Sequence, residues 1–200
     1  HPRSYGIANG SLSSKFIYSS LLIIPCAATL LYGGVDSAAI GLLAAASGLI
    51  ASIWMISSLK NGVLCFNPNL IQLPIIGLII IGLIQLLPLG GPEVPAELSS
   101  LNVSQALTMD PWATRIFLVR LIASLIFFAA ALTYISSENR IRKTVFTIIV
   151  FGSLMAFFGI LQRLALPDAI YGLRPTPQAI PFGPFVNQHH FAAFMELTGG

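Results

Sequence analysis

The sequence predicts an all-α fold, a polytopic bundle of helices embedded in a membrane. Three observations predict it. Only 8% of the 200 residues are charged and the mean hydropathy is +0.85, whereas a soluble domain carries about 25% charged residues. The apolar residues are clustered in runs close to the roughly 20 residues that a helix needs to cross the bilayer. The runs lack the period-two alternation of barrel strands, so helices are the remaining way to satisfy the backbone in lipid.

The apolar runs predict five spans and the start of a sixth. The spans cover about 16–32, 37–59, 70–89, 113–135 and 144–166, and the sixth helix begins near His189. We expect residues 1–200 to form one transmembrane domain. Because the chain opens at His1 and stops inside an apolar run, we expect it to be the N-terminal part of a longer protein.

Small residues recur every four positions along the second run, and such rows let helix backbones approach closely in lipid. They predict that this helix packs tightly through Ser37, Gly41 and Ala45 and through Ala44, Gly48 and Ser52.

The basic residues predict the orientation, because cytoplasmic loops of membrane proteins are enriched in Lys and Arg. The net charge is only +3, but its placement is uneven. One side of the predicted bundle carries Arg3, Lys15, Lys60, Arg140, Arg142 and Lys143; the other carries Asp36, Glu93, Glu97, Asp110 and Asp168. We therefore expect a cytoplasmic N-terminus, with the loops at about 90–112 and 167–188 on the outer side.

Several function classes are disfavoured. The chain has no basic stripe or aromatic-basic module, which argues against a nucleic-acid partner. Cys26 and Cys65 form no disulfide framework. His189 and His190 would point about 100° apart on a helix, and the next acid, Glu196, is about two turns deeper. We expect no metal site and no cofactor.

Arg120 is the charged residue set deepest in a predicted span, about two turns into the fourth. An Arg at the centre of a spanning helix costs about 2.5–3.5 kcal/mol, which the surrounding Leu, Ile, Phe and Val residues offset at about 0.3–0.6 kcal/mol each. The helix therefore still inserts. An ionisable residue inside a membrane indicates function, and the alternative is an Arg that extends to the lipid headgroups.

Three further arginines lie at the outer ends of the predicted spans or in the outer loop, against the positive-inside trend: Arg115, Arg163 and Arg174. A guanidinium binds phosphate through a planar, bidentate fork. An outer cluster of arginines would suit a lipid-linked pyrophosphate. The alternatives are contact with headgroups, which we favour for Arg115, and pairing with Asp110 or Asp168.

The densest motif runs from Phe182 to Ala192. A Pro-rich loop leads to Asn187, and Asn is a good N-cap for the helix that follows. His189 and His190 are candidates for acid-base groups, metal ligands or interfacial polar residues.

At this motif the chain resembles the O-antigen ligase and O-antigen polymerase family of bacterial envelope proteins. The family carries a Gly-x-Phe-x-Asn-x-Asn-His-Phe-Ala pattern after an outer loop, and this sequence reads Gly183-Pro-Phe185-Val-Asn187-Gln-His189-His190-Phe191-Ala192. His189 stands where the family has a second Asn. Weaker similarity covers most of the chain, including Gln85-Leu-Leu-Pro88 and Gly159-Ile-Leu-Gln162.

The resemblance implies envelope glycan biosynthesis in the bacterial inner membrane. The donor would be an undecaprenyl-pyrophosphate-linked glycan, and the acceptor a glycan, a lipid A core sugar or a protein hydroxyl at the periplasmic face. Family enzymes are metal-independent glycosyltransferases. Their catalytic His lies on a loop after the sixth span, so these 200 residues would be inactive alone and would supply part of the donor site.

The resulting hypothesis assigns substrate binding to Arg120, Arg163, Arg174, Asn187 and His190. Two alternatives stay open. A secondary transporter would show paired broken helices or several buried acids, for which Pro25 and Pro74 are candidate break points. A membrane assembly subunit would have no site of its own.

Overall fold

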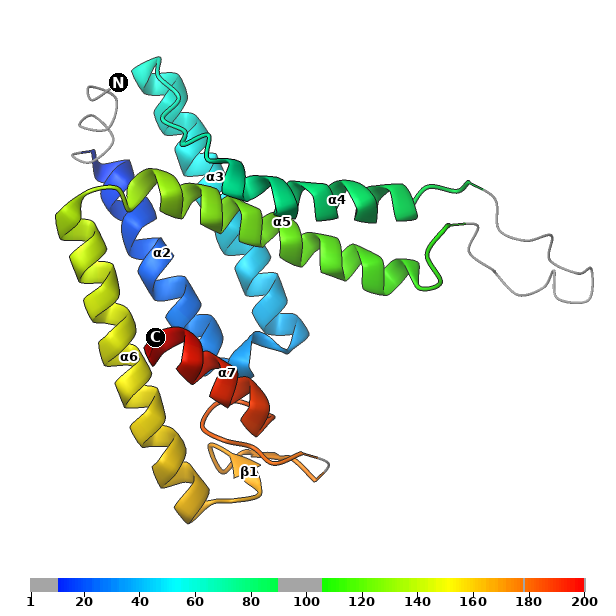
Figure 1. Cartoon of the computed structure of the whole chain (residues 1–200), viewed down its shortest axis with the longest axis vertical. Helices are drawn as coiled ribbons and strands as arrows, with labels where there is room; N and C mark the ends of the chain where they lie inside the picture. Colours follow the sequence, from blue (N-terminus) through cyan, green and yellow to red (C-terminus); the bar gives the residue numbers. More distant parts are fainter. Residues whose placement is uncertain (1–10, 90–105, 178, 200) are drawn as a thin grey trace, which may run out of the picture.

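The structure is a computed structural model that describes residues 11–89, 106–177 and 179–199, and it is mostly helical. The elements in chain order are α2 (Leu12–Leu30), η1 (Tyr32–Gly34), α3 (Ser37–Asn61), η2 (Leu70–Gln72), α4 (Leu73–Gln85), α5 (Pro111–Tyr134), α6 (Glu138–Ala165), β1 (Ala169–Ile170), β2 (Arg174–Pro175) and α7 (Gln188–Gly199). Figure 1 shows α2, α3 and α6 running roughly alongside one another, with α7 turning back beside α6.

Four of these helices are long and apolar enough to cross a membrane: α2, α3, α5 and α6, with 19, 25, 24 and 28 residues. The membrane-embedded helical class is therefore supported, but the count of five spans is not confirmed. The third expected span begins with a 3₁₀ turn, because the side chain of Asn69 accepts a hydrogen bond from the backbone N–H of Ile71. The helical stretch Leu70–Gln85 is about 24 Å long, shorter than the roughly 30 Å hydrocarbon core.

Capping residues set the helix starts, and two helices begin earlier than expected. Ser11 caps α2 by accepting the N–H of Ser14, and Ser137 caps α6 by accepting the N–H of Arg140. The first turns of α6 consequently contain residues 138–143, four of them charged, which the sequence had suggested as a loop. Hydroxyl caps of this kind satisfy backbone donors that the first helical turn leaves unpaired.

The core lies where α2, α3 and α5 meet, and it consists of Ile17, Leu21, Ile50, Ala130 and Tyr134. The hairpin of α4 and α5 runs across α2 and α3 instead of alongside them (Figure 1). Within the hairpin, Gly82 allows close contact, because a Cβ there would lie 2.7 Å from Cδ2 of Leu118.

The predicted tight packing through the small residues of α3 is wrong at its two glycines. Nothing lies within 4 Å of a Cβ built on Gly41 or Gly48. The close approaches occur instead at Gly82, at Gly152 against Thr198, and at Gly159 against Phe182. A small residue permits a close approach but does not specify which helix uses it.

Arg140 is buried, with 9% of its surface exposed, and it joins three helices. Its Nη1 donates to the carbonyl of Tyr134 in α5 at 2.8 Å, and its Nη2 donates to the hydroxyl of Ser14 in α2 at 2.9 Å. The guanidinium also lies 5.0 Å from the ring centroid of Tyr18. A buried charge is tolerated only when its donors are satisfied, so this arginine fixes α6 against α2 and α5.

We predict that Arg140→Ala destabilises the protein by about 2–3 kcal/mol, because it removes hydrogen bonds to a charged group and leaves buried acceptors unpaired. Thermal unfolding of the purified protein in lipid-free detergent measures this loss. Arg142→Ala is the matched control, since Arg142 is exposed on the same helical turn and its loss should change stability by less than about 0.5 kcal/mol. Equal effects of the two substitutions would contradict the anchoring role.

Candidate functional site at the α6–α7 end

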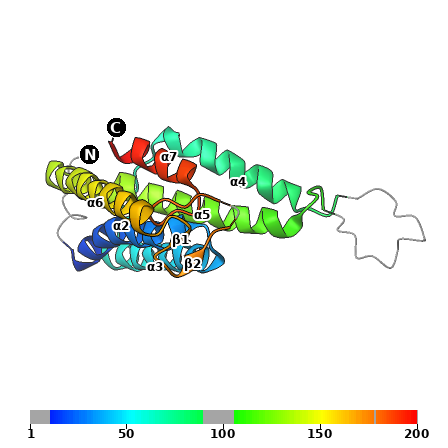
Figure 2. The ribbon, with the colours of Figure 1, turned by 90° about the horizontal axis from the view of Figure 1, so that it is seen from below.

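The segment between α6 and α7 folds back onto the end of the bundle. Strands β1 and β2 pair antiparallel, with Ile170 opposite Arg174, and Tyr171 and Gly172 at the turn have positive φ. Figure 2 shows this hairpin beside the ends of α2 and α3. We call this region, formed by the C-terminal ends of α2 and α6, the N-terminal ends of α3 and α7 and the β1–β2 hairpin, the α6–α7 end.

Arg174 ties the hairpin to the start of α3. Its Nη1 lies 2.7 Å from Oδ2 of Asp36, and its guanidinium lies 4.9 Å from the ring centroid of Tyr32. Asp36 precedes α3 but makes no side-chain cap, so its carboxylate is free to pair with Arg174. The positive end of the α3 dipole also favours a negative charge here.

Tyr171 makes a second connection to the same place. Its hydroxyl donates to the carbonyl of Leu30 at 2.7 Å, satisfying an acceptor that the end of α2 leaves unpaired. Its ring stacks on Phe158 of α6 at 5.5 Å and meets Tyr32 edge-on at 5.9 Å. Burial, and then the neighbouring Tyr32, raise the pKa of Tyr171. The phenol therefore keeps its proton, and with it this hydrogen bond, through neutral pH.

The apolar part of the Phe182–Ala192 motif is a packing element. Phe182 and Phe185 exchange two backbone hydrogen bonds of 3.1 Å, and Pro184 between them is fully buried. Gly33 has a φ of 71°, and a Cβ on it would lie 2.6 Å from Cδ1 of Phe185. A Cβ on Gly159 would lie 2.6 Å from Cε1 of Phe182. These contacts fix where α7 begins relative to η1 and α6.

The polar part of the motif lies at the start of α7. Asn187 caps the helix as expected: its Oδ1 accepts the N–H of His189 at 2.9 Å, and its carbonyl accepts the N–H of His190 at 3.1 Å. His189 and His190 are exposed, and neither imidazole has a hydrogen-bond partner in the part of the chain that the structure describes. Both rings are therefore available to a ligand.

Arg163 lies on the last turn of α6 and is exposed. Its Nη1 donates to the carbonyl of Pro167 at 3.0 Å, which leaves other guanidinium donors free. The neighbouring Gln162 is 6% exposed; its Nε2 donates to the carbonyl of Ala169 at 3.2 Å. Its Oε1 is buried without a partner within residues 11–89, 106–177 and 179–199.

Arg120 lies apart from these residues. It is exposed on α5, which packs against α2, α3 and α4. No hydrogen bond or ion pair joins Arg120 to any other described residue. The structure thus gathers Arg163, Arg174, Asn187 and His190 at the α6–α7 end and places Arg120 on a different element.

Sequence reasoning did not single out Asp36, Tyr32 or Tyr171 as members of this region. The signal for Asp36 was a carboxylate directly before a predicted helix. Only the tertiary structure shows that it does not cap that helix and that it pairs with Arg174. Among the described residues, no three His, Cys, Asp or Glu side chains are placed to hold a metal ion.

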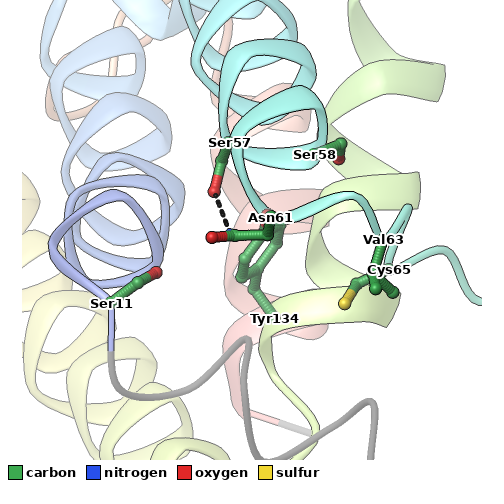
Figure 3. Close-up of a pocket in the computed structure, with 7 residues that line it drawn as sticks. All are labelled: Ser11, Ser57, Ser58, Asn61, Val63, Cys65 and Tyr134. Carbon is green, nitrogen blue, oxygen red and sulfur yellow. Dashed lines mark hydrogen bonds between the residues drawn. The ribbon is translucent and has the colours of Figure 1, made fainter.

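A small, partly open cavity lies at the opposite end of the bundle, near Arg140. Figure 3 shows its lining, which includes Ser11, Ser57, Asn61 and Tyr134. Its volume of about 20 Å³ is close to the minimum of roughly 10–15 Å³ for one water molecule. Asn61 Nδ2 donates to the hydroxyl of Ser57 at 3.4 Å beside it. The cavity is too small for an organic substrate.

We predict an energetic coupling of about 0.5–1 kcal/mol between Asp36 and Arg174, the range for a half-exposed ion pair supported by an aromatic ring. A double-mutant cycle of Asp36→Ala and Arg174→Ala, measured by thermal unfolding in detergent, gives this value, and added salt should reduce it. The control cycle pairs Arg174→Ala with Asp168→Ala, an exposed acid of the same loop. A coupling no larger than that of the control would show that the pair does not hold the hairpin.

Comparison with known proteins adds no assignment: no family model, no curated protein and no solved structure matches this chain. Function is therefore argued from the chemistry of the α6–α7 end and from the sequence resemblance at its motif.

Proposed function

We propose that this chain forms part of the donor-binding face of a membrane glycosyltransferase, which transfers an undecaprenyl-pyrophosphate-linked glycan to a hydroxyl of a glycan, a lipid A core sugar or a protein. One observation carries the proposal. Arg163, Asn187 and the exposed His190, together with Arg174, lie at the same end of the bundle. These are groups that bind phosphate and donate hydrogen bonds at the edge of a membrane.

The placement of the basic residues supports a periplasmic location for this end. Lys15, Lys60, Arg142 and Lys143 are all exposed at the opposite end, and basic residues of this kind mark the cytoplasmic side. The donor would present its pyrophosphate at the outer surface of the inner membrane, where Arg163 and the start of α7 lie under this orientation.

These residues would contribute to the reaction electrostatically. In the transfer step the acceptor hydroxyl gives its proton to a general base, its oxygen forms a bond to the anomeric carbon, and the bond from that carbon to the pyrophosphate oxygen breaks. Negative charge grows on the leaving pyrophosphate, and fixed cationic donors lower the barrier by stabilising it. Arg163 has free donors for this purpose, whereas the charge of Arg174 is already paired with Asp36. Arg163 is thus the stronger candidate of the two.

Arg120 enters the proposal for another reason. It is an exposed cation within an apolar helix and has no hydrogen-bond or ionic partner among the residues that the structure describes. Such a residue is costly in lipid unless a ligand or another segment satisfies it. We propose that the lipid-linked donor satisfies Arg120 through a contact separate from the one at the α6–α7 end.

The secondary-transporter alternative receives less support. Helix α2 continues through Pro25, where Thr29 donates to the Pro25 carbonyl at 2.9 Å. Pro74 lies in the first turn of α4, a position that tolerates proline. Neither candidate break point interrupts a described helix, and broken helices at the midplane are the mark of many transporters.

We predict that Arg163→Ala and His190→Ala, made in the complete gene product, each lower kcat/KM for the lipid-linked donor by about 10- to 100-fold, the effect of losing a charge-assisted hydrogen bond to the leaving pyrophosphate in the transition state. Arg163→Lys should be intermediate, because lysine keeps the charge but not the fork. Transfer by isolated membranes is the assay, and Arg115→Ala is the control for a headgroup arginine. Normal transfer by Arg163→Ala would show that the donor does not bind at the α6–α7 end. Normal transfer by Arg120→Ala would show that Arg120 does not bind the donor.

We predict that a cysteine at Leu173 reacts with a membrane-impermeant thiol reagent added to intact spheroplasts, and that a cysteine at Lys60 does not. Leu173 is 80% exposed in the β1–β2 turn, and Lys60 is exposed at the opposite end. Cys26 and Cys65 are first replaced by serine, and labelling is repeated after lysis to show that both positions can react. The reverse pattern would invert the orientation on which the periplasmic site depends.

A further inference from the structure

A continuous groove runs between α2 and α6. One part, of about 380 Å³, is lined by Tyr18, Leu22, Arg142, Lys143, Phe146 and Thr147. A second part, of about 170 Å³, continues toward α7 and shares Leu22 and Thr147 with the first. The two helices are joined near Arg140 and by few contacts farther along, which leaves this space between them.

The walls of the groove are apolar for most of its length. Leu21, Leu22 and Ile148 face the second part, and Phe194 of α7 closes its far end. Both α2 and α6 are membrane-spanning by length and composition, so the groove opens toward hydrocarbon. A groove of this composition and depth suits an acyl chain, which gains about 0.8 kcal/mol per buried methylene.

The mouth of the groove is cationic. Arg142 and Lys143 line it and are exposed, and no acidic residue is among the described residues that line either part. Arg140, by contrast, is occupied by Ser14 and the Tyr134 carbonyl. Two available cations beside an apolar channel match the arrangement of a phosphate above a fatty acid chain.

We propose that this groove binds an anionic glycerophospholipid, with its phosphate at Arg142 and Lys143 and one acyl chain lying between α2 and α6 toward Phe194. The lipid belongs to the leaflet at the Lys/Arg-rich end of the bundle. This site lies at the end opposite to Arg163 and His190, so it does not depend on the glycan-transfer proposal. Its bound lipid would fill the gap between α2 and α6 and support the position of α6.

Native mass spectrometry of the purified chain tests the proposal, with phosphatidylglycerol and phosphatidylcholine added in detergent. We expect one phosphatidylglycerol adduct that survives activation energies at which phosphatidylcholine is lost. Arg142→Gln with Lys143→Gln should weaken phosphatidylglycerol binding about thirtyfold, since each basic residue at an anionic surface contributes about fivefold. Lys15→Gln with Lys60→Gln removes the same charge at the same end and should weaken it less than about threefold.

The apolar part is tested without changing charge. Thr147→Trp places a large side chain in the shared section of the groove and should abolish the adduct. Ile149→Trp is the matched control, because Ile149 is 54% exposed and does not line the groove. Equal retention of the two lipids, equal loss in the two charge pairs, or an undiminished adduct in Thr147→Trp would each overturn the proposal. Arg142 and Lys143 are exposed, so the protein should tolerate their substitution. The comparison of the two charge pairs therefore still tests the proposal if Thr147→Trp does not fold.

Discussion

The buried guanidinium of Arg140 is held by groups from two other helices. Ser14 comes from α2, the Tyr134 carbonyl from α5, and Arg140 itself from α6. Because burying an unpaired charge costs several kcal/mol, the three helix ends must stay together. This contact sets the direction in which α6 leaves the core, and therefore where the α2–α6 groove, the β1–β2 hairpin and α7 come to lie.

The far ends of the same helices are held differently. There, glycine lets aromatic rings approach the backbone: Phe185 packs on Gly33 and Phe182 on Gly159. Tyr171 and Arg174 add polar connections to Leu30 and Asp36. The motif that resembled a glycan-transferase signature thus divides into two parts, a buried apolar part that positions α7 and an exposed polar part at its first turn. The buried apolar part of the motif is needed to hold the exposed His190 in place. One segment therefore serves both packing and the proposed ligand binding.

The sequence was sufficient to predict the membrane class and the approximate place of each helix, because apolar runs and turn residues are local signals. Helix starts were displaced where a serine caps the backbone ahead of the apolar run, as at Ser11 and Ser137. The third span fell short at its C-terminal end, because α4 stops at Gln85 whereas the apolar run continues to Leu89. The Asp36–Arg174 pair joins residues 138 positions apart, and no local pattern indicates such a partner. No local pattern indicates that Arg140 is buried either, because the orientation rule counts every basic residue as if it were exposed.

Four arginines of this chain show why residue type alone does not identify a binding site. Arg140 donates to buried neutral acceptors, Arg174 is paired with a carboxylate, Arg163 uses one donor on the carbonyl of Pro167 just beyond its helix, and Arg120 has no bond to another described residue. A guanidinium binds a phosphate with the donors that its own protein leaves free. By that criterion the capacity for an anionic ligand increases from Arg140 to Arg120, although Arg140, Arg163 and Arg120 all lie on apolar helices. The tertiary contacts, and not the depth of each arginine in its run, therefore decide which of them is available for chemistry and which holds the fold.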